Sequence, residues 1–133
     1  MLDKTIQNRI EQYSNMIEEL TLGVIFSFKT TKPREVPSLA GVYAIYNNSD
    51  DVIYVGTSKN MKNRIFTNHK NGNMKASSFR VQVSRLLRSK DEYEIKNYIV
   101  KNCRFRVLSI EDNNERYKFE HFAIGVLNPE LND

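Results

Sequence analysis

The stretch that most restricts the fold is GVYAIYNNSDDVIYVG, residues 41–56. Two short runs of β-branched and aromatic residues flank the polar turn NNSDD at 47–51, and this pattern predicts a β-hairpin. Tyr43 stands near the start of the hairpin and Tyr54 near its end. Strands accept Tyr for packing alone, so the hairpin by itself allows two roles for these side chains, core packing or chemistry.

The composition is that of an ordinary globular chain. It has 133 residues, 40% hydrophobic and 27% charged, which fits one domain. There is no apolar run of eighteen residues and no signal-peptide core, so we expect neither a membrane span nor secretion. Cys103 is the only cysteine, which excludes an intrachain disulfide and a cysteine-based zinc site. The simplest compartment for such a chain is the cytoplasm.

Positive charge is concentrated in one part of the sequence. The net charge of the chain is +4, yet residues 57–90 contain nine Lys or Arg and no Asp or Glu. One basic segment in an otherwise acidic chain favours a polyanionic partner. A solvated helical surface is the alternative explanation of the same run.

Hydrophobic periodicity predicts the other elements. Residues 3–20 repeat apolar side chains at four- and three-residue spacing, so we expect an amphipathic helix that docks on the domain or, alternatively, forms a dimer contact. In the helix at 77–89 we expect Phe79, Val83, Leu86 and Leu87 on the buried face, with Arg80, Arg85 and Arg88 exposed. The remaining predicted elements are a short strand at 23–29, helices at 60–69, 92–102 and 115–127, and a strand at 104–110.

One carboxylate in the last predicted helix faces apolar neighbours. On a helical wheel Glu120 lies beside Ile124 and Ala123, away from the polar arc. A carboxylate in such a place costs free energy unless a cation or hydrogen-bond donors meet it. Two partners are open. One is Arg116, a turn earlier, in an ion pair, and the other is a divalent metal held by one carboxylate, water and substrate phosphate.

The polar candidates occur in a recognisable order. They are Tyr43 in GVY, Tyr54 in YVG, Arg64 in the helix that follows, Glu120 in a late helix, and Asn132 twelve residues further on. Phosphodiester cleavage needs a base for water, a cation on the phosphate and a group that stabilises the leaving oxygen. The ordered set resembles the GIY-YIG nuclease family over residues 41–132.

The resemblance implies an α+β fold, with a small three-stranded central sheet flanked by helices and an extra N-terminal helix. The helix and connector would occupy residues 1–36, and the catalytic domain residues 37–133. The implied activity is a metal-dependent DNA endonuclease that leaves 5′-phosphate and 3′-hydroxyl ends. It would use one Mg²⁺ or Mn²⁺ per site and act on double-stranded or branched DNA, in repair, restriction or a mobile element.

The resemblance also implies a role for each residue. Tyr43 and Tyr54 would line the active site, and one of them would activate or orient the attacking water. Arg64 would bind the scissile phosphate. Glu120 would hold the metal, and Asn132 would brace the site through hydrogen bonds.

The chain departs from the family pattern at one position. Many members carry a His four residues after the Arg, where this chain has Asn68, and the His follows as His69. A shift of one residue turns a side chain by about 100° on a regular helix. His69 therefore reaches the site only if the helix ends or is distorted there, and an exposed helix-end His is the alternative.

The basic segment would face DNA, as a loop and basic helix do in some short family members. The side chains expected to contact DNA are Lys59, Lys62, Lys70, Lys75, Ser77, Arg80, Arg85 and Arg88. Two other functions remain open: a non-catalytic nucleic-acid-binding module that uses residues 57–90, and an accessory domain that dimerises through the N-terminal helix. A homodimer is also the simplest way to cut two strands with one site per chain.

Overall fold

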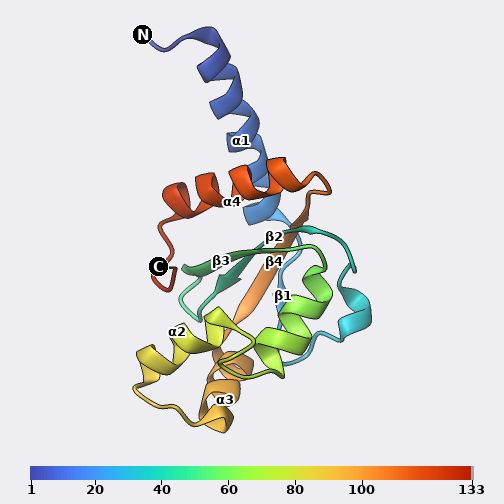
Figure 1. Ribbon diagram of the computed structural model, residues 1–133, viewed down its shortest axis with the longest axis vertical. Helices are drawn as coiled ribbons and strands as arrows, with labels where there is room; N and C mark the ends of the chain where they lie inside the picture. Colours follow the sequence, from blue (N-terminus) through green and yellow to red (C-terminus); the bar gives the residue numbers. More distant parts are fainter. Residues whose placement is uncertain (133) are drawn as a thin grey trace.

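The computed structural model describes residues 1–132 as one antiparallel sheet with helices on both of its faces (Figure 1). The elements are α1 (Lys4–Leu22), β1 (Phe26–Ser27), the 3₁₀ turn η1 (Pro33–Glu35), β2 (Gly41–Tyr46), β3 (Val52–Ser58), the π-helix η2 (Asn63–Lys70), α2 (Ser78–Leu87), α3 (Glu92–Asn102), β4 (Arg104–Ser109) and α4 (Asn113–Leu127). No helix within residues 1–132 has the length and apolar character needed to cross a membrane.

The sheet has four strands in the order β1-β4-β2-β3, and every pair is antiparallel. The α+β class expected from the sequence is confirmed, but the three-strand count was one too low. The additional strand is β1, whose two residues pair with the start of β4. The hairpin of β2 and β3 forms as predicted, and β3 is an edge strand.

Alternation along the hairpin separates two cores. Tyr43 and Ile45 point to the face covered by η2, α2 and α3, where they join Phe79, Ile95 and other buried side chains. Val42, Ala44 and Tyr46 point to the opposite face, where α1 and α4 pack. Figure 1 shows the two layers of helices, with α1 and α4 on one side of the sheet and α2 and α3 on the other. Tyr43 therefore belongs to the layer that contains the basic segment.

The N-terminal helix docks through its second half. Tyr13 and Leu20 are buried against the sheet, whereas Ile6 and Ile10 are exposed. Figure 1 shows the first half of α1 extending beyond the rest of the molecule. The guanidinium of Arg9 joins the two regions, because it contacts both Tyr13 and the carboxylate of Glu115 on α4. The predicted docking thus applies to the second half of the stripe only.

Candidate active site

The two glycines of the hairpin create room for neighbouring groups. Gly56 is the cross-strand partner of Tyr43, and a Cβ at position 56 would lie 2.5 Å from the Cζ of Tyr43 and still closer to its hydroxyl. A Cβ at Gly41 would collide with the carbonyl of Leu108 and with the side chain of Met61. Only glycine allows the Tyr43 ring to lie flat over the neighbouring strand. The glycines of GVY and YVG therefore have a steric cause.

A buried chain of hydrogen bonds starts at the first tyrosine. The hydroxyl of Tyr43 lies 2.6 Å from Nε2 of His69, and Nδ1 of His69 lies 2.6 Å from Oγ of Ser77. All three residues are almost completely buried. Burial, with smaller contributions from Arg64 and Arg80, lowers the pKa of His69 to about 3. The imidazole is therefore neutral near pH 7.

Helix distortion is what brings His69 to the site. The segment after Asn63 is a π-helix, and the amide N–H of Asn71 donates to the carbonyl of Phe66, five residues back. In a π-helix residues five apart lie nearly above one another, as residues four apart do in an α-helix. The wider turn compensates the one-residue shift between Asn68 and His69. The interpretation of His69 as an exposed helix-end residue was wrong.

Hydrogen-bond accounting assigns the tautomer of His69. Ser77 Oγ accepts the backbone N–H of Arg80 at 3.1 Å as the N-cap of α2, so its hydroxyl proton needs an acceptor in a buried place. Nδ1 of His69 is the acceptor at hand. Nε2 then carries the ring proton and donates to Tyr43. The first tyrosine consequently receives a hydrogen bond at the oxygen that would bear charge.

The second tyrosine lies beside the first. Its hydroxyl is 2.7 Å from Oγ of Ser78, and its ring meets His69 edge-on and packs against Phe79. Burial raises the pKa of Tyr43 well above its usual value, and the charges of Tyr54 and Glu120 add to this effect, while Arg64 lowers it. Both tyrosine rings pack against His69, and Arg64 and Glu120 are near enough to the Tyr43 phenol to influence its pKa.

Glu120 is a half-buried carboxylate without an ion pair among residues 1–132. Desolvation raises its pKa, and His121 opposes this slightly. The ion pair with Arg116 does not form, because that guanidinium donates to the carbonyls of Ile110 and Glu111 and to the side chain of Asn113. Glu120 is therefore free to meet another cation.

The donor set limits which metal could bind. Within residues 1–132 no three His, Cys, Asp or Glu side chains gather as a ligand cluster. Zinc sites use several protein ligands, whereas Mg²⁺ is commonly held by one or two carboxylates together with water and substrate phosphate. Glu120 alone, half-buried and without a protein partner, fits the second kind of site.

The C-terminal segment is tied to the edge of the sheet. The side-chain amide of Asn132 accepts from the N–H of Val55 at 2.7 Å and donates to its carbonyl at 2.8 Å. The N–H of Leu131 adds a bond of 2.8 Å to the carbonyl of Ile53. These bonds satisfy the open edge of β3 on either side of Tyr54. Asn132 thus lies where it can hold the position of the second tyrosine.

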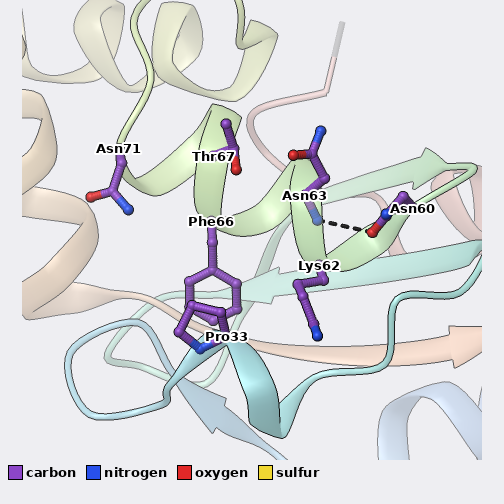
Figure 2. Close-up of a pocket in the computed structure, with 7 residues that line it drawn as sticks. All are labelled: Pro33, Asn60, Lys62, Asn63, Phe66, Thr67 and Asn71. Atoms are coloured by element: carbon purple, nitrogen blue, oxygen red, sulfur yellow. Dashed lines mark hydrogen bonds between the residues drawn. The ribbon is translucent and has the colours of Figure 1, made fainter.

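Two hollows flank the start of the π-helix. The first, about 380 Å³, is lined by Thr57, Ser58, Lys59, Asn60, Asn63, Arg64, Arg116 and Tyr117. The second, about 300 Å³, is lined by Pro33, Asn60, Lys62, Asn63, Phe66, Thr67 and Asn71. Figure 2 shows the amides of the second hollow above the rings of Phe66 and Pro33. Because Asn60 and Asn63 line both, the two hollows adjoin at the first turn of this helix.

Two of the residues expected to contact DNA are internal. Arg80 is 1% exposed, and its guanidinium donates to the carboxylate of Glu92 and to the carbonyls of His69 and Lys70. Ser77 is equally buried as the cap of α2. Both predictions were wrong, because α3 and η2 supply partners that the local sequence does not reveal. The others reach the surface at least in part: Lys59, Lys62, Lys70, Lys75, Arg85 and Arg88.

The face predicted for α2 was also partly wrong. Leu86 is 44% exposed, and Phe79 and Val83 form the buried stripe together with Arg80. Sequence reasoning also missed the contacts of Ser77 and Ser78 with the site. Their signal was the pair of serines at the start of a helix, a typical N-cap pattern, but Ser77 had been interpreted only as a DNA contact.

Comparison with known proteins identifies the domain type. The family model described as the GIY-YIG catalytic domain matches residues 39–132. The chain is 31% identical over 103 residues to UvrABC system protein C of Methanosphaera stadtmanae and 35% identical over 78 residues to that of Clostridium tetani. The matches cover 74% and 59% of this chain but only 15% and 11% of those proteins.

A solved structure is similar as well. It is the GIY-YIG N-terminal endonuclease domain of UvrC from Thermotoga maritima, bound to magnesium as its catalytic divalent cation. The two chains are 18% identical, the TM-score is 0.49, and the match covers 78% of this chain and 99% of that one.

Proposed function

The chain belongs to the GIY-YIG catalytic-domain family, and from this premise we propose that it is a divalent-metal-dependent DNA endonuclease. The observation that carries the proposal is the packing of both hairpin tyrosines against the buried His69, with the Tyr43 hydroxyl 2.6 Å from Nε2 of His69. A phenol, a guanidinium and an unpaired carboxylate supply the three parts that phosphodiester hydrolysis requires. Water attacks phosphorus and the 3′ oxygen leaves, which gives 5′-phosphate and 3′-hydroxyl ends.

Tyr43 is the phenol that takes the proton from water. His69 donates Nε2–H to its oxygen and Arg64 lowers its pKa, so both favour the phenolate that burial alone opposes. Tyr54 has a different environment, since its hydroxyl lies against Ser78. We assign it to orienting the water and the substrate rather than to proton transfer. Under this proposal Tyr43, and not Tyr54, is the base of the two hairpin tyrosines.

Arg64 and Glu120 act on the phosphate. The guanidinium of Arg64 lines the hollow beside β3, where a forked contact can hold two phosphate oxygens and neutralise the charge of the transition state. The carboxylate of Glu120 would hold one Mg²⁺ or Mn²⁺. When bound, this ion supplies Lewis-acid stabilisation of the leaving oxygen. Asn132 is a positioning residue, because its bonds to Val55 fix the strand between Tyr54 and Gly56.

A homodimer is the oligomeric form we propose. One active site per chain cuts one strand, so cutting both strands calls for a second copy. The exposed apolar residues Ile6 and Ile10 of α1, with Leu2 just before the helix, are the surface for that copy. Light scattering should give twice the mass of one chain, and Ile6→Glu with Ile10→Glu should give the monomer. A monomeric native chain at assay concentration would refute this part alone.

Plasmid nicking tests the central proposal. The native chain should convert supercoiled plasmid to the nicked form with Mg²⁺ or Mn²⁺ and not with a chelator. Glu120→Gln should be inactive. Glu94→Gln, an exposed carboxylate in the first turn of α3, is the matched control and should cut normally. Ligation of the nicks without prior repair checks the 5′-phosphate and 3′-hydroxyl ends. Salt-dependent binding without nicking would favour a non-catalytic module that uses residues 57–90.

A further inference from the structure

A second phosphate-binding subsite adjoins the position of Arg64. We infer that Lys59, Arg116 and Tyr117 bind the DNA phosphate next to the one that is cleaved. This inference takes its ligand class from the proposed function, and it assigns a role to three side chains that the catalytic mechanism leaves unused. Together with Arg64 they line one hollow of about 380 Å³.

The positive charge of Arg116 has no counter-charge among its partners. This side chain is 1% exposed, and it donates to two main-chain carbonyls and to the Asn113 side chain, all of them uncharged. Within residues 1–132 no carboxylate forms an ion pair with it. Buried arginines are normally paired, because an uncompensated charge in a low dielectric is costly. An anion in the adjoining hollow would supply the missing counter-charge.

The second argument is an unmet hydrogen-bond donor. Three of the five N–H groups of the guanidinium have acceptors, and the buried Nε of Arg116 has none. Buried donors without an acceptor are rare in folded proteins. Phosphate oxygens are strong acceptors with a geometry that suits guanidinium. Arg116 therefore lacks a hydrogen-bond acceptor as well as a counter-charge.

The third argument is the rest of the lining. Lys59 adds a third cation to Arg64 and Arg116. Thr57 and Ser58 add hydroxyls, and no Asp or Glu among residues 1–132 lines the hollow. The ring of Tyr117 is 48% exposed and lies 5.5 Å from the Arg116 guanidinium. An exposed aromatic beside cations suits a sugar-phosphate backbone or a base stacked on the ring.

The position of the hollow sets the order of the phosphates. Lys59 and Asn60 come from the loop after β3, while Arg116 and Tyr117 come from the start of α4, one turn before Glu120. A phosphate between these segments would neighbour one held by Arg64 and Glu120. A single strand can thus place consecutive phosphates on the two sets of residues.

The salt dependence of DNA binding tests the subsite. Affinity of a 12-base-pair duplex is measured by fluorescence anisotropy between about 50 and 200 mM salt, with Glu120→Gln as the background so that nothing is cut. Lys59→Ala and Arg116→Gln should each reduce the slope of log affinity against log salt by about 0.9, the value of one phosphate contact. Tyr117→Ala should weaken binding without changing that slope.

Lys101→Ala is the charge-matched control. Lys101 ends α3 next to β4 residue Arg104, at the opposite end of the sheet from Ser58, and its loss should leave the slope unchanged. A slope unaltered by Lys59→Ala, which needs no buried change, would overturn the inference. An equal loss for Lys101→Ala would overturn it too. If the variants change the slope as expected but the native chain never nicks DNA, the endonuclease proposal is refuted and the subsite is retained.

Discussion

Replacing Gly56 by alanine should disrupt the site through a single methyl group. That methyl would lie 2.5 Å from the Cζ of Tyr43, well inside van der Waals contact. The ring cannot simply turn away, because it is 1% exposed and its hydroxyl is hydrogen-bonded to His69 at 2.6 Å. Either the two strands separate locally or the ring leaves its place.

The magnitude follows from these two costs. Overpacking a close-packed core destabilises by about 1–3 kcal/mol. Breaking the buried Tyr43–His69 hydrogen bond costs about 1–3 kcal/mol more, because the hydroxyl of Tyr43 and the imidazole of His69 are then buried without a hydrogen-bond partner, water included. Gly56→Ala should therefore lower the free energy of unfolding by about 2–6 kcal/mol. It should also abolish nicking, since the phenol is displaced from Arg64 and Glu120.

Urea denaturation followed by circular dichroism measures this loss. Gly125→Ala is the matched control, because position 125 lies inside α4 and a Cβ there meets nothing within 4 Å. It should stabilise the helix by about 0.5–1 kcal/mol and leave nicking intact. The two alanines should thus act in opposite directions. If Gly56→Ala were as stable and as active as the native chain, the confinement of Tyr43 would be refuted.

Three further predictions concern charge. Between pH 7 and 5 the native chain should lose about 2 kcal/mol of stability at His69. The cause is that the unfolded chain binds a proton at this imidazole in that range, whereas the folded chain, in which the pKa of His69 is about 3, does not. Urea titrations of His69→Gln should lack this part of the loss. Mg²⁺ should raise the melting temperature of the native chain but not of Glu120→Gln, as scanning calorimetry can show. Arg80→Ala should cost about 3–5 kcal/mol in urea, because Glu92 loses its ion pair and three carbonyls lose a donor, whereas exposed Arg88→Ala should cost little.

Local patterns predicted the elements of this fold well. The hairpin, the helix at 92–102 and the strand that follows it lie where periodicity and turn residues indicated. A short strand was expected at 23–29 and forms at 26–27, but its place in the sheet was not predicted. Two residues carry no alternation, so their pairing depends on β4 and could not be inferred from the local sequence.

The site could be predicted where residue type and order carry the information. Tyr43, Tyr54 and Glu120 have neighbours that make their positions unusual along the chain itself. The place of His69 depends on a π-helix, for which the sequence has no reliable mark. Arg80 was assigned to the surface because its burial is made possible by Glu92, a residue of another helix. Long-range partners of polar side chains are what a single sequence conceals.

Glu120 is a second case in which a single sequence does not reveal the partner of a polar side chain. The apolar face of α4 indicated a carboxylate in a partly desolvated place, and Glu120 is half-buried with a raised pKa. The nearest candidate partner by sequence, Arg116, instead donates hydrogen bonds to two carbonyls of the loop before the helix. Helical spacing alone could not choose between an ion pair and a free carboxylate.

The most direct test of the account compares cleavage and binding in the same variant. Single-turnover nicking by native chain and Glu120→Gln is measured with Mg²⁺, together with the affinity of each for the same DNA. The account predicts that Glu120→Gln binds DNA within about threefold of the native chain but cleaves at least about a thousandfold more slowly, a loss of roughly 4 kcal/mol in transition-state stabilisation. Equal cleavage rates for the two proteins would contradict the assignment of Glu120 and, with it, the proposed catalytic centre.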